Sequence, residues 1–158
     1  MTLPTPLMAG KRGLVMGVAN DRSIAWGIAR SIAAQGAEVA FTYQGEALYK
    51  RVKPLAESIG SSLVIECDVA KDESIASCFA TVAKTWPSID FVVHAIAFSD
   101  KEELKGLYLD TTRENFQITM DISCFSFTAV AKHAATMMKQ GGSLVTLTYY
   151  GAERVMPH

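Results

Sequence analysis

The chain has 158 residues, about the length of one domain, and 49% of them are hydrophobic, which is enough to bury a core. Its formal net charge is −1, so no strong electrostatic field draws it to nucleic acid or to anionic lipid. Length and charge therefore favour one compact domain over residues 1–158 and argue against a nucleic-acid or membrane partner.

Short apolar strands alternate with amphipathic helices from the start of the chain. A strand is predicted over residues 13–16, a helix over residues 23–35 and a second strand over residues 38–43. The apolar face of the first helix consists of isoleucines four residues apart: Ile24, Ile28 and Ile32. A second helix has apolar residues at helical spacing, and its Pro54 is expected to kink it or to begin its second half.

The alternation continues through the second half of the chain. A third strand is predicted over residues 63–66, and the helix after it has an apolar face made by Ile75, Cys78, Phe79 and Val82. A fourth strand covers residues 91–94, and a polar loop follows to about residue 110. One long helix, or two in succession, then extends to residue 140, where two glycines end it. A fifth strand covers residues 143–147.

Strands that alternate with helices in this way predict an α/β fold with a doubly wound parallel sheet, the Rossmann fold, truncated after strand five. Right-handed crossovers favour the strand order 3-2-1-4-5. Ligands of such sheets bind at the carboxyl ends of the strands, where the order reverses. The predicted crevice therefore lies between the first and the fourth strand.

The turn after the first strand differs from the usual G-x-G-x-x-G of dinucleotide-binding proteins. Gly17 ends the strand and is expected to let the backbone approach a phosphate, and Ser23 is expected to cap the helix and to offer its hydroxyl to a pyrophosphate. Gly27 is expected to let the helix pack closely on the sheet. An ordinary capping serine between two turn glycines explains the same residues, so the pattern alone leaves both interpretations open.

Polar residues also follow the second and third strands. Gln44 stands where NAD-binding units often have an acidic residue for the ribose, and no cation follows before Lys50, which favours NADH over NADPH. Asp68 is a candidate acceptor for the adenine amino group, with Val69 beside the ring. Asp72 is the better candidate for the cap of the next helix, which would leave Asp68 free.

The ends of the fourth and fifth strands supply the remaining candidates. Ile96 is expected to line the nicotinamide ribose side of the crevice. His94 is interpreted as structural, because it ends a buried strand and no carboxylate neighbour is evident. Tyr149 and Tyr150 follow the fifth strand, where a phenol can donate a hydrogen bond to a developing oxyanion. A tyrosine half-buried at a sheet edge is the alternative.

Three cysteines without a C-x-x-C pair argue against a disulfide framework or a zinc site and are typical of a reducing compartment. The first residues do not resemble a signal peptide, and no apolar run is long enough to span a membrane. The expected location is the cytoplasm, and no metal is expected.

Several motifs together resemble one family, the bacterial NADH-dependent enoyl-[acyl-carrier-protein] reductases, a divergent branch of the short-chain dehydrogenase/reductase superfamily. The resemblance covers about residues 11–158, and the T-G-x-x-x-G-x-G and N-N-A-G motifs of ordinary superfamily members are absent. The motifs that carry the resemblance are Gly17-x5-Ser23-x3-Gly27, "FTYQ", "CDV", "HAIAFS", "MDISCFSF" and "YYGAERVMP".

The resemblance implies an activity and a set of site residues. The family reduces the trans-2 double bond of enoyl thioesters linked to acyl carrier protein, with NADH as hydride donor, in fatty-acid elongation. The implied NAD contacts are Gly17, Ser23, Ile24, Gln44, Asp68, Val69 and Ile96. Ser99 stands at a substrate-binding position, and Tyr149 matches the first of two active-site tyrosines. The superfamily also implies a homotetramer, built partly through the long helices after the fourth strand.

The second active-site tyrosine of the family follows "ERxxP" plus one residue, and this sequence stops at His158, one position earlier. The chain is therefore expected to be the N-terminal part of a longer protein and to be inactive by itself. Two other functions stay open. A ketone-reducing superfamily enzyme would need Tyr-x-x-x-Lys after His158, and a non-catalytic NAD-binding domain would need no second tyrosine.

Overall fold

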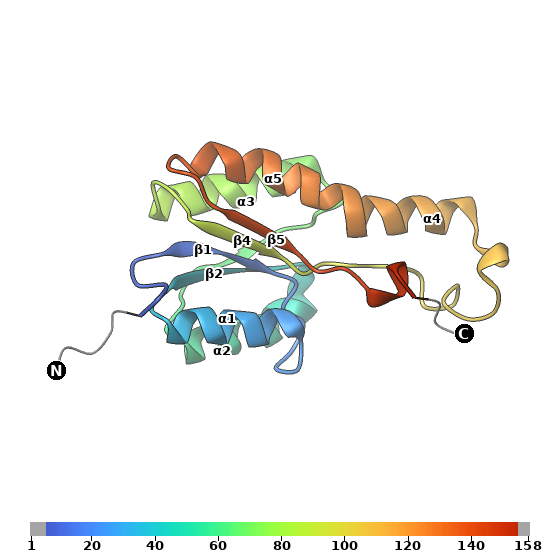
Figure 1. The fold of residues 1–158 in the computed structure, drawn as a ribbon, viewed down its shortest axis with the longest axis horizontal. Coiled ribbons are helices and arrows are strands. Elements are labelled where there is room, and N and C mark those ends of the chain that lie inside the picture. Colours follow the sequence, from blue (N-terminus) through green and yellow to red (C-terminus); the bar gives the residue numbers. More distant parts are fainter. Residues whose placement is uncertain (1–5, 155–158) are drawn as a thin grey trace.

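The computed structural model describes residues 6–154, without the side chain of residue 152, and shows a five-stranded parallel sheet (Figure 1). The strand order is β3-β2-β1-β4-β5, which confirms the predicted doubly wound topology. The strands have these bounds: β1 Arg12–Met16, β2 Glu38–Tyr43, β3 Val64–Glu66, β4 Phe91–His94 and β5 Ser143–Thr146.

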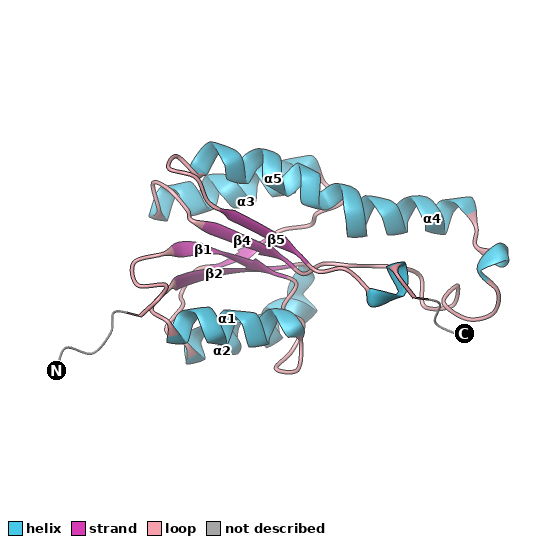
Figure 2. Cartoon of the chain, viewed as in Figure 1, coloured by secondary structure: helices cyan, strands magenta, loops and turns pink. Residues whose placement is uncertain are grey.

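Helices cover both faces of the sheet. Helices α1 and α2 lie on one face, and α3 and α5 lie on the other, while α4 continues the line of α5 beyond the sheet (Figures 1 and 2). The helices have these bounds: α1 Ile24–Ala34, α2 Gly45–Ser58, α3 Asp72–Thr85, α4 Arg113–Met120 and α5 Ser126–Met137. A π-helical turn, η2 Asp121–Phe125, joins α4 to α5, and two short 3-10 helices complete the fold: η1 Tyr108–Asp110 and η3 Tyr150–Ala152.

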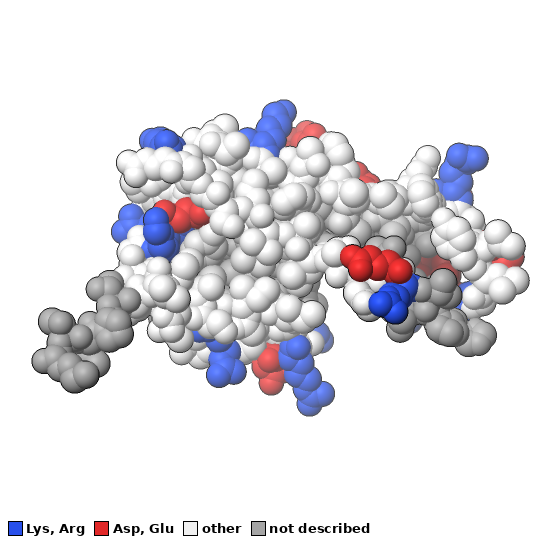
Figure 3. Space-filling view, viewed as in Figure 1, with Lys and Arg blue, Asp and Glu red and all other residues white. Residues whose placement is uncertain are grey.

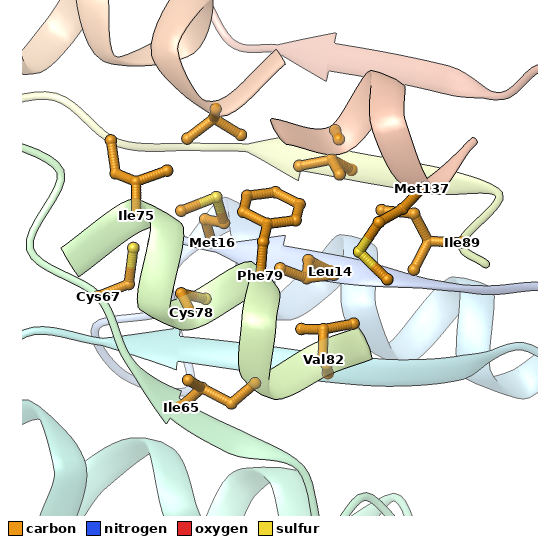
Figure 4. Close-up of a cluster of buried hydrophobic side chains, with 14 of the residues drawn as sticks. Leu14, Met16, Ile65, Cys67, Ile75, Cys78, Phe79, Val82, Ile89 and Met137 are labelled. Atoms are coloured by element: carbon orange, nitrogen blue, oxygen red, sulfur yellow. The ribbon is translucent and has the colours of Figure 1, made fainter. Parts of the chain in front are cut away.

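Two apolar clusters, one on each face of the sheet, hold the layers together. Leu14 and Val92 are register partners on β1 and β4, and both are fully buried in the cluster beneath α3 and α5 (Figure 4). Val15 and Phe41, partners on β1 and β2, face α1 and α2 instead. Because both faces are covered, the central strands are continuous apolar runs, as parallel sheets require.

The buried face of α1 differs from the prediction. Its buried residues are Ala25, Trp26 and Ala29, whereas Ile24 is 69% exposed. Trp26 packs against Phe41 with 6.2 Å between ring centroids, and the small alanines beside it let the helix approach the sheet. The spacing of the isoleucines identified the helix correctly, and Ile28 and Ile32 pack partly buried against the core, but Ile24 does not belong to the buried face.

Two further helix predictions are refined. Helix α2 continues across Pro54 as one element. The long helical stretch before β5 is one line of helix interrupted by the π turn, and α5 ends at Met137, three residues before the predicted end. Strand β5 lies at the edge of the sheet, pairs with β4 and is largely exposed, in contrast to the four strands beside it.

Candidate functional site

A pocket of about 340 Å³ opens at the carboxyl ends of the strands, beside the point where the order reverses between β1 and β4. Its walls come from four successive strand ends and from the π turn, so residues far apart in sequence meet there. The lining residues are Gly17, Val18, Ala19, Thr42, Tyr43, Gln44, Leu48, Cys67, Asp68, Val69, Ala95, Ile96, Ala97, Phe98 and Ile122. The predicted crevice is therefore present where the topology rule places it.

Gly17 forms the floor of the pocket between β1 and β4. Its φ of +93° is a conformation that L side chains rarely adopt, and a Cβ atom there would collide with the carbonyl oxygen of Ala95. The amide of Ala95 in turn donates to the carbonyl of Met16 at 3.1 Å. Gly17 is thus required by the close approach of the two strand exits, a reason that the sequence did not reveal.

The turn before α1 is organised by Asn20. Its carbonyl accepts from both the amide and the hydroxyl of Ser23, at 3.2 Å and 2.7 Å, and its side chain accepts from the amide of Arg22 at 2.8 Å. Ser23 occupies the N-cap position with extended dihedral angles, but its hydroxyl caps no amide, so the predicted side-chain cap is wrong.

The N-terminus of α1 is suited to an anion. Its first turn has no acidic residue, whereas the first turns of α2, α3 and α4 each have one or two. The carbonyl of Ser23 accepts from the Trp26 amide at 3.0 Å, but its hydroxyl binds no amide of the helix, so the amides of Ile24 and Ala25 and the positive end of the helix dipole remain available. Ser23 and Ile24 lie outside the lining of the pocket.

Gly27 does not have the predicted role. It is exposed on the outer face of α1, and a Cβ atom there would meet nothing within 4 Å. The residue that brings α1 close to the sheet is the buried Ala29 instead.

Gln44, Asp68 and Val69 meet at the β2–β3 side of the pocket. Asp68 does not cap α3, but its carboxylate has partners: it accepts from the amide of Ala70 at 3.2 Å and pairs with Lys71 at 3.1 Å. Burial opposes ionisation of Asp68, but the contacts from Lys71 and Ala70 outweigh it and hold the pKa of the carboxyl below its usual value.

The cap of α3 also differs from the prediction. Asp72 is the first residue of the helix, and Lys71 holds the cap position. Asp72 and Glu73 therefore stabilise α3 through the helix dipole in its first turn, without a capping hydrogen bond.

The residues predicted at the substrate end of the site do not all line the pocket. Ile96 lines the pocket, but Ser99 lies outside it, where its hydroxyl bonds to Asn115 and Thr119 of α4. Tyr149 and Tyr150 follow β5 and are 66% and 62% exposed, also outside the lining. The end of the motif that contains these tyrosines, residues 155–158, falls outside the described residues.

His94 is enclosed and fully hydrogen-bonded. Its Nε2 lies 2.8 Å from the hydroxyl of Ser126, its Nδ1 lies 3.3 Å from that of Thr146, and the ring meets Phe127 edge-on. Burial lowers the pKa of the imidazole, which keeps it neutral. The geometry supports the structural interpretation: His94 joins β4 to β5 and α5.

Sequence reasoning missed several lining residues. Tyr43 and Leu48 border the Gln44 side, Phe98 and Ile122 close the β4 side, and Cys67 contributes a buried thiol. Successive side chains of a strand point alternately to the two faces of the sheet. This alternation along β2 could have identified Tyr43, the last residue of the strand. Ile122 had no such signal, because the π turn determines where it points.

Among residues 6–154, no three side chains of the metal-binding types gather into a cluster. No helix in the same range combines the length and the apolar character that crossing a bilayer requires.

Known proteins match the chain over nearly its whole length. The model of the enoyl-(acyl carrier protein) reductase family matches residues 17–158. An NADH-dependent enoyl-[acyl-carrier-protein] reductase of Rhizobium meliloti is 63% identical over 152 residues, which are 96% of this chain and 57% of the relative. The chain thus spans about three fifths of the length of the relatives that it matches.

Solved structures agree with the fold. The enoyl reductase of Anaplasma phagocytophilum, solved with NAD, is 56% identical and superimposes with a TM-score of 0.94, over 98% of this chain and 59% of that one. The enoyl reductase of Bacillus cereus, solved with NADP+ and an indole naphthyridinone, is 49% identical with a TM-score of 0.92, over 95% of this chain and 59% of that one.

Proposed function

Because the chain belongs to the enoyl-(acyl carrier protein) reductase family, we propose that the protein reduces the trans-2 double bond of enoyl thioesters on acyl carrier protein, with NADH, in fatty-acid elongation. The observation that carries this proposal is the pocket at the strand ends. Five of the seven residues expected to contact NAD line it: Gly17, Gln44, Asp68, Val69 and Ile96.

The other two expected NAD contacts, Ser23 and Ile24, are assigned to the pyrophosphate. They begin α1, whose first amides are free of a side-chain cap and whose first turn has no acidic residue. A dinucleotide that extends from the pocket toward this helix would place its two phosphates on those amides.

The adenosine end is assigned to Gln44, Asp68 and Val69. Asp68 is held by the Ala70 amide and by Lys71, and Gln44 lines the same side of the pocket. Lys71 is already paired with Asp68, and the carboxylate would repel a 2′-phosphate. These contacts favour NADH over NADPH, although the B. cereus relative was solved with NADP+.

The substrate end is assigned to Ile96, Ser99 and Tyr149. Bound NADH supplies the hydride. Ile96 forms part of the apolar wall on the β4 side, and Ser99 lies next to it on the same loop. The exposed phenol of Tyr149 would donate a hydrogen bond to the thioester carbonyl as negative charge develops there.

A homotetramer in the cytoplasm completes the proposal. The α4–η2 line presents a shallow apolar groove whose aromatic residues Phe116 and Phe125 are 50% and 56% exposed, and a second copy of the chain is the proposed occupant. All three cysteines are free thiols, in keeping with a reducing compartment.

Nicotinamide fluorescence tests the binding half of this proposal. We expect residues 1–158 to bind NADH more tightly than NADPH, and Gln44→Ala to weaken NADH binding by roughly tenfold, since the adenosine ribose would lose the Gln44 amide. The matched control is Gln140→Ala, which removes an exposed amide far along the chain. If the chain does not bind NADH, or if Gln44→Ala and Gln140→Ala behave alike, the assigned site is wrong.

Turnover tests the catalytic half. Residues 1–158 alone should bind NADH without oxidising it, because the second tyrosine of the family would follow His158. A chimera that joins residues 1–158 to the C-terminal part of the R. meliloti relative should oxidise NADH with a crotonyl thioester and not with an acetoacetyl thioester. Oxidation with acetoacetyl alone would favour a ketone reductase, and silence with both would favour a non-catalytic NAD-binding domain.

A further inference from the structure

The segment that leaves β4 forms one wall of the pocket without any regular secondary structure of its own. Residues 95–98 all line the pocket, yet the last pairing of this segment with the sheet is the bond from Ala95 to Met16. From Ile96 onward the wall depends on contacts from elsewhere. Those contacts come from α4 and the π turn η2, which lie alongside the segment.

Ser123 in the π turn binds both backbone polar groups of Phe98. Its hydroxyl accepts from the Phe98 amide at 3.0 Å and donates to the Phe98 carbonyl at 3.1 Å. A hydroxyl can donate one hydrogen bond and accept others, so one side chain satisfies both groups, as a neighbouring strand would. Phe98 is the last residue of the segment that lines the pocket.

The same helix line holds the next two residues of the segment. Asn115 accepts from the Asp100 amide at 2.9 Å and donates to the Ser99 hydroxyl at 3.2 Å, and Thr119 bonds to Ser99 at 3.0 Å. Asn115, Thr119 and Ser123 are therefore three polar residues, spaced by four, that face one extended segment. We refer to these three residues as the polar ladder.

The π turn accounts for the alignment of the polar ladder. In a regular α-helix each residue turns the chain by about 100°. Ser123 follows Asn115 by eight residues, so it would point roughly 80° away from the side on which Asn115 lies. A π turn bonds i to i+5 and rotates less per residue, so Ser123 stays on the side that faces the segment. The same turn brings Ile122 into the lining of the pocket.

We propose that Ser123 is a positioning residue for the dinucleotide pocket, whose hydroxyl fixes the wall formed by residues 95–98 through both backbone groups of Phe98. The ligand is the one of the proposed function, NADH, on which this inference rests. A wall held in its bound form before binding costs less conformational entropy when the ligand arrives. Removing the hydroxyl therefore weakens binding even though Ser123 itself is not in the lining.

The test compares three variants with the unchanged chain. Ser123→Ala removes both bonds to Phe98, and Ser123→Thr keeps a hydroxyl at the same position. Ser58→Ala is the matched control, because the Ser58 hydroxyl bonds within its own helix, to the Leu55 carbonyl at 2.7 Å. For each protein, NADH fluorescence gives the Kd, thermal unfolding gives the Tm, and hydrogen exchange read by mass spectrometry gives the protection of residues 96–99.

We expect Ser123→Ala to raise the Kd for NADH roughly three- to tenfold, the change that the loss of one or two hydrogen bonds brings, and to speed exchange in residues 96–99. Ser123→Thr should restore both values, and Ser58→Ala should change neither. Equal Kd values for Ser123→Ala and the unchanged chain would overturn the inference, as would equal weakening by alanine and threonine. Failure of the unchanged chain to bind NADH would instead refute the proposed function.

Discussion

Gly17 and Gly27 belong to the same sequence motif but have opposite environments. Gly17 combines a positive φ with the backbone of Ala95 against its Cα, whereas Gly27 faces open space on a helix. A motif read as a unit therefore contains one glycine that the fold requires and one that the fold merely tolerates. Replacement of each by alanine separates the two.

We predict that Gly17→Ala destabilises the protein by at least about 2 kcal/mol, through the disfavoured φ and the collision with Ala95, and abolishes NADH binding. Gly27→Ala should stabilise it by about 0.5–1 kcal/mol, because alanine restricts the unfolded chain and is the better helix former. Urea unfolding and NADH titration of both variants provide the measurements. A destabilised Gly27→Ala protein would show that α1 needs the space at that position.

At the scale of elements, single polar residues join strands and helices at both ends of β4. His94 links the carboxyl end of β4 to β5 and α5. At the other end, Asp90 accepts from the amide of Arg12 at 2.9 Å and pairs with Lys11 at 2.8 Å. Both contacts fix β4 against its neighbours, and the pocket wall formed by residues 95–98 continues directly from this strand.

The Asp90 contact predicts a pH dependence of stability. The hydrogen bond from Lys11, aided by the Arg12 amide, holds the pKa of Asp90 below its usual value. Because the folded-state pKa is lowered, the contribution is fully present above the unfolded pKa, about 3.9, and is lost as the pH falls through the folded value. Asp90→Asn should therefore lower the Tm at pH 7, and the difference should shrink below about pH 4.

The matched control is Glu46→Gln, which removes an exposed pair with Lys50 at 3.7 Å. An exposed pair of this kind contributes little, so the Tm should hardly change at either pH. A difference between Asp90→Asn and the unchanged chain that stays constant from pH 7 to pH 3 would show that ionisation of Asp90 is not the cause.

At the scale of the whole molecule, the exposed surface is unevenly charged. Charged side chains lie mainly toward the periphery of the view in Figure 3, and its centre is largely uncharged. Val145 of the edge strand β5 is 42% exposed, and Leu147, which follows the strand, is 40% exposed. The α4–η2 line presents Phe116 and Phe125. Such apolar surface is typical of protein interfaces, in keeping with the proposed tetramer.

We predict that Phe125→Glu reduces the assembly to smaller species, since a buried charge in the groove lined by Phe116 would stay unpaired. Sedimentation velocity measures the change. Leu7→Glu is the control, because Leu7 is 88% exposed near the N-terminal end of the described chain and does not line the groove. The same sedimentation coefficient for Phe125→Glu and Leu7→Glu would rule out this face as the interface.

The sequence by itself determined the layout of the fold. Alternating short apolar strands and amphipathic helices implied a parallel sheet covered on both faces, and handedness then limited the strand order. The order placed the pocket, so Gly17, Gln44, Asp68, Val69 and Ile96 could be selected because each stands at a strand end. This selection needs only the sequence, because strand ends are local features that topology brings together.

Only the tertiary structure decided how individual side chains are used. Whether Asp68 is free, whether Gly27 touches the sheet and whether Ser99 faces the pocket depend on partners distant in the chain. The π turn is the clearest case, because a shift of one residue in helical hydrogen bonding aims Ile122 into the pocket and Ser123 at Phe98. Periodicity reports which residues share a face, but packing against a particular neighbour decides which face is buried.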